Sequence, residues 1–177
     1  YYLEYSDAAP VTTPWKEFIA ELYSDEYLRF IEKMLNMKRG TYSLVISWHY
    51  MTRGTCITPH CDTEKKIGSQ LFYLNTSDTW KDAWGGQTLA LDDEGKRDPK
   101  SGPELSEFTK IFKSKSVDNN SFIFTRTNHS WHAVDVINCP EDVIRKMFSI
   151  VANRKPSFYR RVKKRIKNLF TIFPLPR

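Results

Sequence analysis

The pattern of hydrophobic and polar positions changes its period near residue 40. Over residues 13–37, apolar side chains recur at the three- and four-residue spacing of amphipathic helices. Thr13 followed by Pro14, and Ser24 ahead of a segment that runs to Met37, are typical of helix starts. The pattern therefore predicts two helices at the start of the chain.

After Gly40 the chain consists of short segments rich in β-branched and aromatic residues, separated by turn-forming clusters. This spacing predicts a β-sandwich or a β-barrel. Residues 92–103 are polar and rich in Gly and Pro, which predicts a mobile surface loop, and the pattern of Glu104–Phe112 fits no single element. The expected strands are Tyr42–Tyr50, Ile67–Asn75, Gln87–Asp92, Ser121–Thr125, Ser130–Ile137 and Ile144–Ala152.

The composition indicates one folded domain, because 177 residues, 40% of them hydrophobic, suffice for one core and are too few for two. The formal charge of +6 comes from the C-terminal end, where nine of the 27 Lys and Arg lie in residues 154–177 without any acid. Residues 1–153 carry 18 basic and 21 acidic residues, or −3, so nucleic acid is not an expected partner of this part. We expect a domain over 1–153, with helices in 13–37 and a β core in 41–153, and a separate basic tail over 154–177.

The tail is predicted to form a basic amphipathic helix from residue 157 onward. Phe158, Val162 and Ile166 share one face, while lysine and arginine residues gather mostly on the other. Such a helix can pack on the domain or contact an anionic membrane, and the sequence leaves both interpretations open.

The cysteines Cys56, Cys61 and Cys139 are odd in number and widely spaced, which argues against a disulfide scaffold and for a reducing compartment. No apolar run reaches membrane-spanning length, and the first residues lack the features of a signal peptide. We therefore expect a cytoplasmic protein. Because the chain opens on Tyr1 rather than on Met, earlier removal of a targeting segment stays an open alternative.

The candidate chemistry centres on two of the four histidines. In extended chain, the two-residue spacing of His60 and Asp62 turns both side chains to one face, where they can share a metal ion. His132, in an apolar segment much later in the chain, is the expected third ligand, and two histidines with one carboxylate are typical of non-haem iron(II) oxygenases. His129 is the rival for the third position, although its surroundings are typical of a turn.

An arginine follows the distal histidine inside an apolar strand, where an unpaired guanidinium is costly. Strand alternation puts Arg145 and Ser149 on one face, and an arginine fork with a nearby hydroxyl suits a carboxylate. Pairing of Arg145 with Glu141 or Asp142 at the strand edge is the structural alternative. Lys146 is a rival for the carboxylate, but alternation turns it to the opposite face.

Six segments, taken in order, carry a resemblance to a known family. They are residues 50–54 (YMTRG), 60–62 (HCD), 72–75 (FYLN), 84–89 (WGGQTL), 130–134 (SWHAV) and Arg145. This ordered set, which covers about residues 42–152, resembles the prolyl-4-hydroxylase-like branch of the iron(II)/2-oxoglutarate-dependent dioxygenases. The resemblance implies a double-stranded β-helix, the jelly-roll of cupin-like proteins, and hydroxylation of a C–H bond with succinate and CO2 as co-products.

The resemblance also implies roles for seven residues. Three side chains are expected to hold iron, and four are expected to contact 2-oxoglutarate, among them an arginine that pairs with its distal carboxylate. The implied cofactors are Fe(II), 2-oxoglutarate and O2, with ascorbate as a candidate addition. His49 is expected to face away from Tyr50 and to be structural. The predicted iron ligands are His60, Asp62 and His132, and the predicted 2-oxoglutarate contacts are Arg145, Tyr73, Tyr50 and Ser149.

Two other functions stay open at the level of sequence. One is a catalytically inactive jelly-roll module whose basic tail contacts membrane or nucleic acid. The other is a zinc-dependent cupin-like enzyme, in which Arg145 would have no evident role. Because a scaffold does not fix its substrate, a peptide, an amino acid, a glycan or another small molecule all stay candidates. The sequence does not indicate the oligomeric state.

Overall fold

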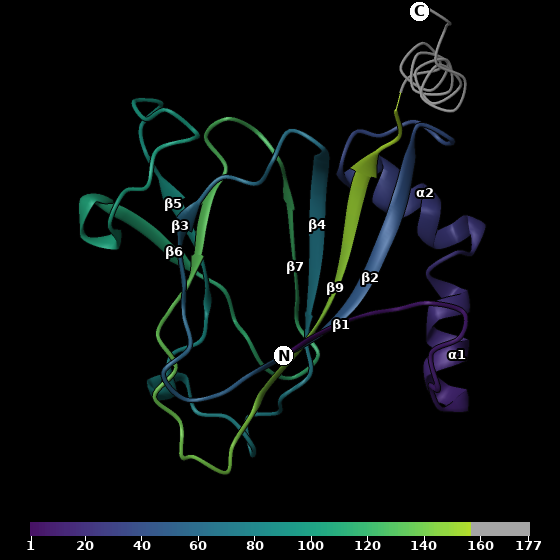
Figure 1. Cartoon of the computed structure of the whole chain (residues 1–177), viewed down its shortest axis with the longest axis horizontal. Helices are drawn as coiled ribbons and strands as arrows, with labels where there is room; N and C mark the ends of the chain where they lie inside the picture. The colour runs from purple at the N-terminus through teal and green to yellow at the C-terminus, as the bar shows by residue number, and fades with distance from the viewer. Residues whose placement is uncertain (157–177) are drawn as a thin grey trace, which may run out of the picture.

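The computed structural model describes residues 1–156, and two facing antiparallel β-sheets make up most of it (Figure 1). The basic helix predicted from residue 157 lies outside the described residues. The five-stranded sheet has the order β1-β2-β9-β4-β7, and the four-stranded sheet has the order β3-β8-β5-β6. The strands are β1 Tyr2–Glu4, β2 Tyr42–Met51, β3 Ile57–His60, β4 Lys66–Tyr73, β5 Thr88–Asp92, β6 Lys110–Lys113, β7 Ser121–Thr125, β8 Trp131–Val134 and β9 Arg145–Arg154.

The strand order is that of a jelly-roll. From β2 to β9 the chain passes repeatedly from one sheet to the other, and most strands pair with neighbours that are distant in sequence. The mainly β jelly-roll fold predicted from the sequence is therefore confirmed. The six expected strands are present with their ends shifted by up to three residues, and β1, β3 and β6 are additional.

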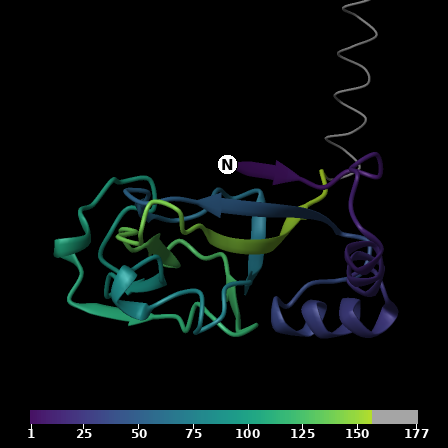
Figure 2. The same ribbon diagram turned by 90° about the horizontal axis from the view of Figure 1, so that it is seen from below.

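Two helices cover the outer face of the five-stranded sheet (Figures 1 and 2). They are α1, Thr13–Glu21, and α2, Asp25–Met34, which ends earlier than predicted. Ser24 caps α2 as predicted, because its Oγ accepts a hydrogen bond from the backbone N–H of Tyr27 at 3.1 Å. The N-cap of α1 is Thr12, one residue before the predicted position.

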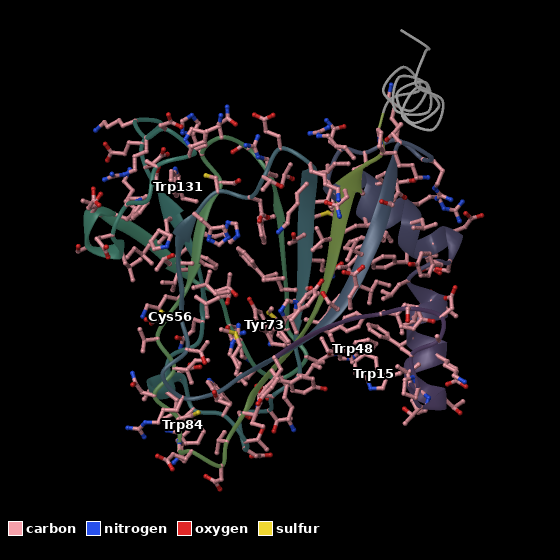
Figure 3. The ribbon with its side chains drawn as sticks, in the orientation of Figure 1. Trp15, Trp48, Cys56, Tyr73, Trp84 and Trp131 are labelled. Atoms are coloured by element: carbon pink, nitrogen blue, oxygen red, sulfur yellow. The ribbon has the colours of Figure 1, made fainter. Side chains whose placement is uncertain are left out.

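Aromatic side chains join these helices to the sheet. The ring centroid of Trp15 on α1 lies 5.2 Å from that of Trp48 on β2 and 5.2 Å from that of Phe148 on β9 (Figure 3 labels the two tryptophans). Burial of an aromatic side chain stabilises the fold by about 2–3 kcal/mol. Because Phe148 faces the helices, alternation along β9 turns Arg145 toward the other sheet.

Residues 93–109 fold over the outer face of the four-stranded sheet. They include the short 3-10 helix η2, Leu105–Glu107, and Phe108, whose ring centroid lies 5.8 Å from that of Trp131. This loop covers Leu89 and Leu91 on the outer face of the sheet. The other face of the four-stranded sheet therefore faces the five-stranded sheet. A second 3-10 helix, η1, spans Asp82–Trp84. Within residues 1–156, no helix has the length and apolar character needed to cross a membrane.

Candidate metal centre

Two histidines and one aspartate meet between the two sheets. His60 ends β3 and is the cross-strand partner of His132 on β8, so both imidazoles point to the same side. Their ring centroids are 4.3 Å apart. The carboxylate of Asp62, just after β3, completes a group in which one ligand-type atom of each residue lies within 4.8 Å of the others. The fold thus brings together the three side chains that were expected to share a metal ion.

Backbone carbonyls fix which nitrogen of each imidazole faces the group. Nδ1 of His60 lies 2.9 Å from the carbonyl oxygen of Thr58, and Nδ1 of His132 lies 3.0 Å from that of Ser130. Since a carbonyl oxygen only accepts, each Nδ1 carries the proton and each Nε2 presents a lone pair. Burial lowers the pKa of His132, which favours this neutral form.

The carboxylate of Asp62 is buried and only half satisfied. Its Oδ1 accepts from Nζ of Lys66 at 2.6 Å, whereas Oδ2 has no hydrogen-bond partner. Nε2 of His60 lies 4.0 Å from Oδ1, and Nε2 of His132 lies 4.0 Å from Oδ2. Two lone pairs and a buried anionic oxygen therefore converge, an arrangement that a cation would stabilise. The residues fit a divalent metal ion with two nitrogen ligands and one oxygen ligand.

His129, the rival for the third position, lies outside this group. Its Nδ1 is 2.9 Å from Oδ2 of Asp93, which also accepts from Nε1 of Trp131 at 3.0 Å. Burial alone would raise the pKa of Asp93, but its hydrogen bonds, with that of His129 first, hold the pKa at about 2. His129 therefore anchors the loop after β5, and His132 is the histidine that the fold directs at Asp62.

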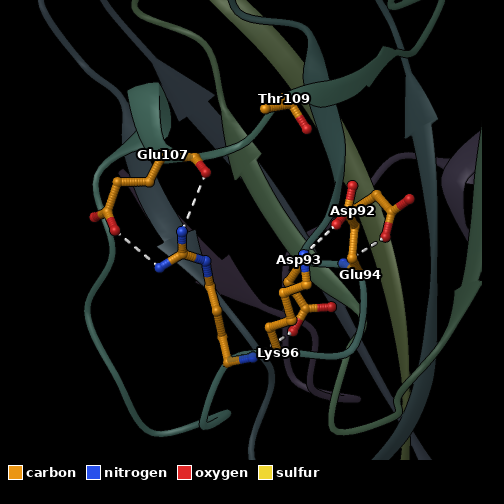
Figure 4. A pocket seen from close by; sticks show the side chains of 7 residues that line it. Asp92, Asp93, Glu94, Lys96, Glu107 and Thr109 are labelled. Atoms are coloured by element: carbon orange, nitrogen blue, oxygen red, sulfur yellow. Dashed lines mark hydrogen bonds and ion pairs between the residues drawn. The ribbon is translucent and has the colours of Figure 1, made fainter.

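A pocket with a volume of about 360 Å³ lies beside Asp93, among residues 92–109 (Figure 4). Its charged side chains already have partners. Arg97 donates to Oε2 of Glu107 at 2.8 Å, and Lys96 donates to Oε2 of Glu94 at 2.5 Å. Because these charges are paired, the pocket gives no reason to bind an ion, and we assign it a role in holding the loop.

Arg145 lies at the start of β9, on the face that looks toward the four-stranded sheet, and only 2% of it is exposed. Its Nη1 approaches the sulfur atoms of Met51 and Met147 at 3.4 and 3.7 Å, while Nε and Nη2 have no partner. Burial lowers the pKa of Arg145 to about 10, a value at which the side chain stays charged at neutral pH. The fold therefore holds a cation in apolar surroundings.

In the described part of the chain, no carboxylate lies within salt-bridge distance of Arg145. The structural alternative, an ion pair with Glu141 or Asp142, is therefore wrong. Lys146, the rival cation, is the cross-strand partner of Tyr50 and faces the other way. A buried guanidinium without an anion is costly, so this position has the chemistry to bind one.

Two neighbours position the side chain of Arg145. Its guanidinium carbon lies 5.6 Å from the ring centroid of Tyr73, which Figure 3 shows between the two sheets. The hydroxyl of Tyr73 donates to Oγ of Ser114 at 2.9 Å. Gly86, at φ +75°, lies against the aliphatic stem of the arginine, because a Cβ added there would be 2.9 Å from Cδ of Arg145. The absence of a side chain at Gly86 therefore makes room for the arginine.

Ser149 shares the face of Arg145, but its hydroxyl is engaged elsewhere. Its Oγ lies 2.8 Å from Nε2 of His49 and 2.9 Å from Oγ of Ser47. Met147 stands between Ser149 and Arg145 on this face, and four residues of extended strand separate their backbones by about 13 Å. The structure does not bring the hydroxyl and the guanidinium to one point, so the predicted joint contact with a carboxylate has no support.

The prediction that Tyr50 lies beside the cosubstrate is wrong. In the register of β2 with β9, Tyr50 pairs with Lys146 and Met51 pairs with Arg145. Alternation therefore puts Tyr50 on the outer side, 37% exposed, and turns His49 to the inner side. The two residues face opposite ways as predicted. Tyr50, however, was expected on the inner side and lies on the outer one, whereas His49 lies on the inner side. Burial, together with the charge of Arg145, lowers the pKa of His49 to about 4 and keeps the imidazole neutral.

No family model matches the chain, and no curated protein does. Solved structures do match. A prolyl-4-hydroxylase from Pseudomonas putida superposes with a TM-score of 0.60 at 14% identity, over 88% of this chain and 72% of that one. HygX from Streptomyces hygroscopicus, solved with iron bound, gives a TM-score of 0.55 at 13% identity, over 88% and 72%. An oxidoreductase of the 2OG-Fe(II) oxygenase family from Burkholderia pseudomallei gives 0.53 at 19% identity, over 82% and 61%. The chain thus has the fold of the family that its motifs resemble.

Proposed function

We propose that this chain is an iron(II)- and 2-oxoglutarate-dependent dioxygenase that hydroxylates a C–H bond of its substrate. The observation that carries the proposal is the buried, unpaired guanidinium of Arg145 in a fold that also assembles a metal-ready group. The metal group alone would suit zinc as well as iron. In a zinc enzyme the arginine has no role, whereas a 2-oxoglutarate enzyme needs a cation for the distal carboxylate.

His60, Asp62 and His132 would hold the iron through two Nε2 atoms and one carboxylate oxygen. Lys66 occupies Oδ1 of Asp62 and leaves Oδ2 free, which favours binding of the metal through one oxygen. When bound, iron with 2-oxoglutarate and O2 supplies the oxidising chemistry, in which 2-oxoglutarate gives succinate and CO2 and one oxygen atom enters the substrate C–H bond. Halogenating relatives lack the carboxylate ligand, so Asp62 favours hydroxylation.

Arg145 would bind the distal carboxylate of 2-oxoglutarate through Nε and Nη2, the two nitrogens without a partner. Water is excluded from the guanidinium, so its attraction for an anion is weakly screened. The thioethers of Met51 and Met147 are weak acceptors and compete little with a carboxylate. Tyr73 supports the guanidinium with its ring. Ascorbate would serve as a reductant that keeps the iron in its iron(II) form.

Formation of succinate without any substrate tests this function. Purified protein with iron(II), ascorbate, 2-oxoglutarate and O2 should form succinate slowly, and omission of iron or O2 should stop it. Arg145→Met should lower the rate at least tenfold at limiting 2-oxoglutarate. Lys146→Met is the matched control, because it removes the adjacent cation from the opposite face and should leave the rate unchanged. A folded, iron-loaded sample that neither binds 2-oxoglutarate nor forms succinate would contradict the proposal.

A further inference from the structure

A row of aromatic rings leads from the metal group toward the surface. The ring centroid of Phe124 on β7 lies 4.6 Å from that of His132, and that of Phe122 lies 5.8 Å from that of Phe124. The ring of Phe112 on β6 follows at 6.2 Å from Phe122, with the two planes inclined by 20°. These rings connect the edges of the two sheets, since β6 ends one sheet and β7 ends the other.

The strand register puts the outer end of the row on the metal-facing side. Phe112 is the cross-strand partner of Ala90, and Ala90 is the cross-strand partner of His132. Partners across an antiparallel pair point to the same side of a sheet. Phe112 therefore shares its face with the imidazole of His132, and only the small side chain of Ala90 lies between them.

The aromatic row is not a sealed core. Phe112 is 60% exposed, all four residues of β6 are exposed, and Phe122 and Phe124 are only partly buried. Exposed aromatic surface at a sheet edge is a liability in a soluble protein unless something binds there. An open, shallow depression lies beside Phe112, at the outer end of the row, and its lining includes Ala90, Lys110 and Phe112. Phe122, Phe124 and the three expected metal ligands are not part of this lining.

The charges around the depression have partners. Nζ of Lys110 lies 3.3 Å from Oδ2 of Asp92 and 3.8 Å from Oε1 of Glu94. His129, another lining residue, is held by Asp93. Because each of these groups is paired, the depression favours neither an anion nor a cation, and the apolar ring faces are its main attraction for a ligand.

We propose that this aromatic row is the substrate site and that the substrate presents an uncharged ring to Phe112 and Phe122. The inference rests on the proposed function, because another part of the same substrate is to be oxidised at the metal group. The ring would lie against the exposed face of Phe112, and the rest of the substrate would extend over Ala90 toward His132. A larger side chain at position 90 would close this path.

Binding of 4-fluorobenzamide, an uncharged ring with one fluorine atom, tests the site by fluorine NMR titration of the full chain. Phe112→Ala should weaken binding about fivefold, the change expected for loss of one aromatic contact, and Phe112→Tyr should retain it. Phe30→Ala removes a phenylalanine of similar exposure, 45%, from α2 and should leave binding unchanged. Equal affinity of wild type and Phe112→Ala would overturn the proposal and leave the row a packing feature only.

Mn(II) in place of iron(II) tests whether the bound probe lies near the metal group. The unpaired electrons of Mn(II) broaden the fluorine signal of a nearby ligand. Wild type should show this broadening, whereas His60→Ala should bind the probe without it. Ala90→Leu should weaken probe binding at least fivefold with Mn(II) still bound. Probe binding with no broadening in Mn(II)-loaded wild type would overturn the substrate site and leave the oxygenase function intact. A different result would overturn the oxygenase function instead. In that case the protein binds neither Mn(II) nor 2-oxoglutarate, although binding of the probe still depends on Phe112.

Discussion

The guanidinium carbon of Arg145 lies 5.6 Å from the ring centroid of Tyr73, in surroundings where no described carboxylate pairs with it. A buried cation–π contact contributes about 2 kcal/mol. Removal of an ion from water costs several kcal/mol, which is more than this contact returns. Arg145 therefore lowers the stability of the ligand-free protein, and binding of an anion would relieve this cost.

Arg145→Met should raise the free energy of unfolding of the ligand-free protein by about 1–3 kcal/mol, because an unpaired buried charge is replaced by an apolar side chain. Urea denaturation measures the change. Lys146→Met, on the exposed face, should stay within about 0.5 kcal/mol of wild type. A clear loss of stability in Arg145→Met would mean that the guanidinium has a stabilising partner in the ligand-free protein.

His132→Ala and His129→Ala should have opposite effects on metal binding and stability. Loss of His132 removes a ligand and should weaken Mn(II) binding at least about 100-fold in calorimetric titration. His129→Ala should keep the metal affinity within about threefold. It should lower the free energy of unfolding by about 1–3 kcal/mol, because the buried carboxylate of Asp93 loses a donor. Strong metal binding by His132→Ala would show that the third ligand is another residue.

Gly86→Ala should weaken 2-oxoglutarate binding at least about tenfold, because the added Cβ would displace the stem of Arg145. Gly95→Ala is the matched control, since Gly95 also has a positive φ, +72°, but nothing within 4 Å of the added Cβ. Both variants should lose about 1 kcal/mol of stability from backbone strain, and only Gly86→Ala should lose affinity. Equal affinities of the two variants would remove the role assigned to Gly86.

The free energy of unfolding should fall as the pH falls from about 6.5 to about 4, and His49 should account for part of the change. Burial, followed by the charge of Arg145, lowers the pKa of His49 to about 4 in the folded protein. The unfolded imidazole binds a proton near pH 6.5, so in this window the unfolded state holds more protons and acid favours it.

His49→Gln should therefore reduce the loss over this window by about 1–2 kcal/mol, less than the full shift because the ring is partly exposed. Urea denaturation at several pH values measures the slope. His132, whose pKa is also lowered, acts in the same direction and stays in the variant. Identical slopes for wild type and His49→Gln would contradict the assigned environment of His49.

The sequence pattern was sufficient to predict the strands inside the sheets, but it did not predict most of the strands at the sheet edges. The additional strands β1, β3 and β6 all lie at sheet edges, where short segments carry little apolar alternation. β3 even contains Pro59, a residue that is tolerated at an edge and argues against an interior strand. The spacing of His60 and Asp62 could be interpreted without knowing the strand, because extended chain alone puts both on one side.

The sequence could not show which side chains of β2 point to the interior between the sheets, because both sides of this strand are covered in the fold. Trp48 packs under the helices, and Ser47 and His49 face the interior between the sheets. A strand buried on both faces shows no clear alternation of apolar and polar residues. Only the pairing of Tyr50 with Lys146 settles that Tyr50 faces outward, and this pairing depends on a segment almost one hundred residues later.

The binding of 2-oxoglutarate by Arg145 can be measured by calorimetric titration of the cosubstrate into Mn(II)-loaded protein. Wild type and Lys146→Met should bind the cosubstrate with affinities within about threefold of each other. Arg145→Met should bind it at least about 100-fold more weakly, the scale expected when a buried charge pair loses one partner, while it retains Mn(II). Equal binding of 2-oxoglutarate by Mn(II)-loaded wild type and Arg145→Met would show that Arg145 does not bind the cosubstrate.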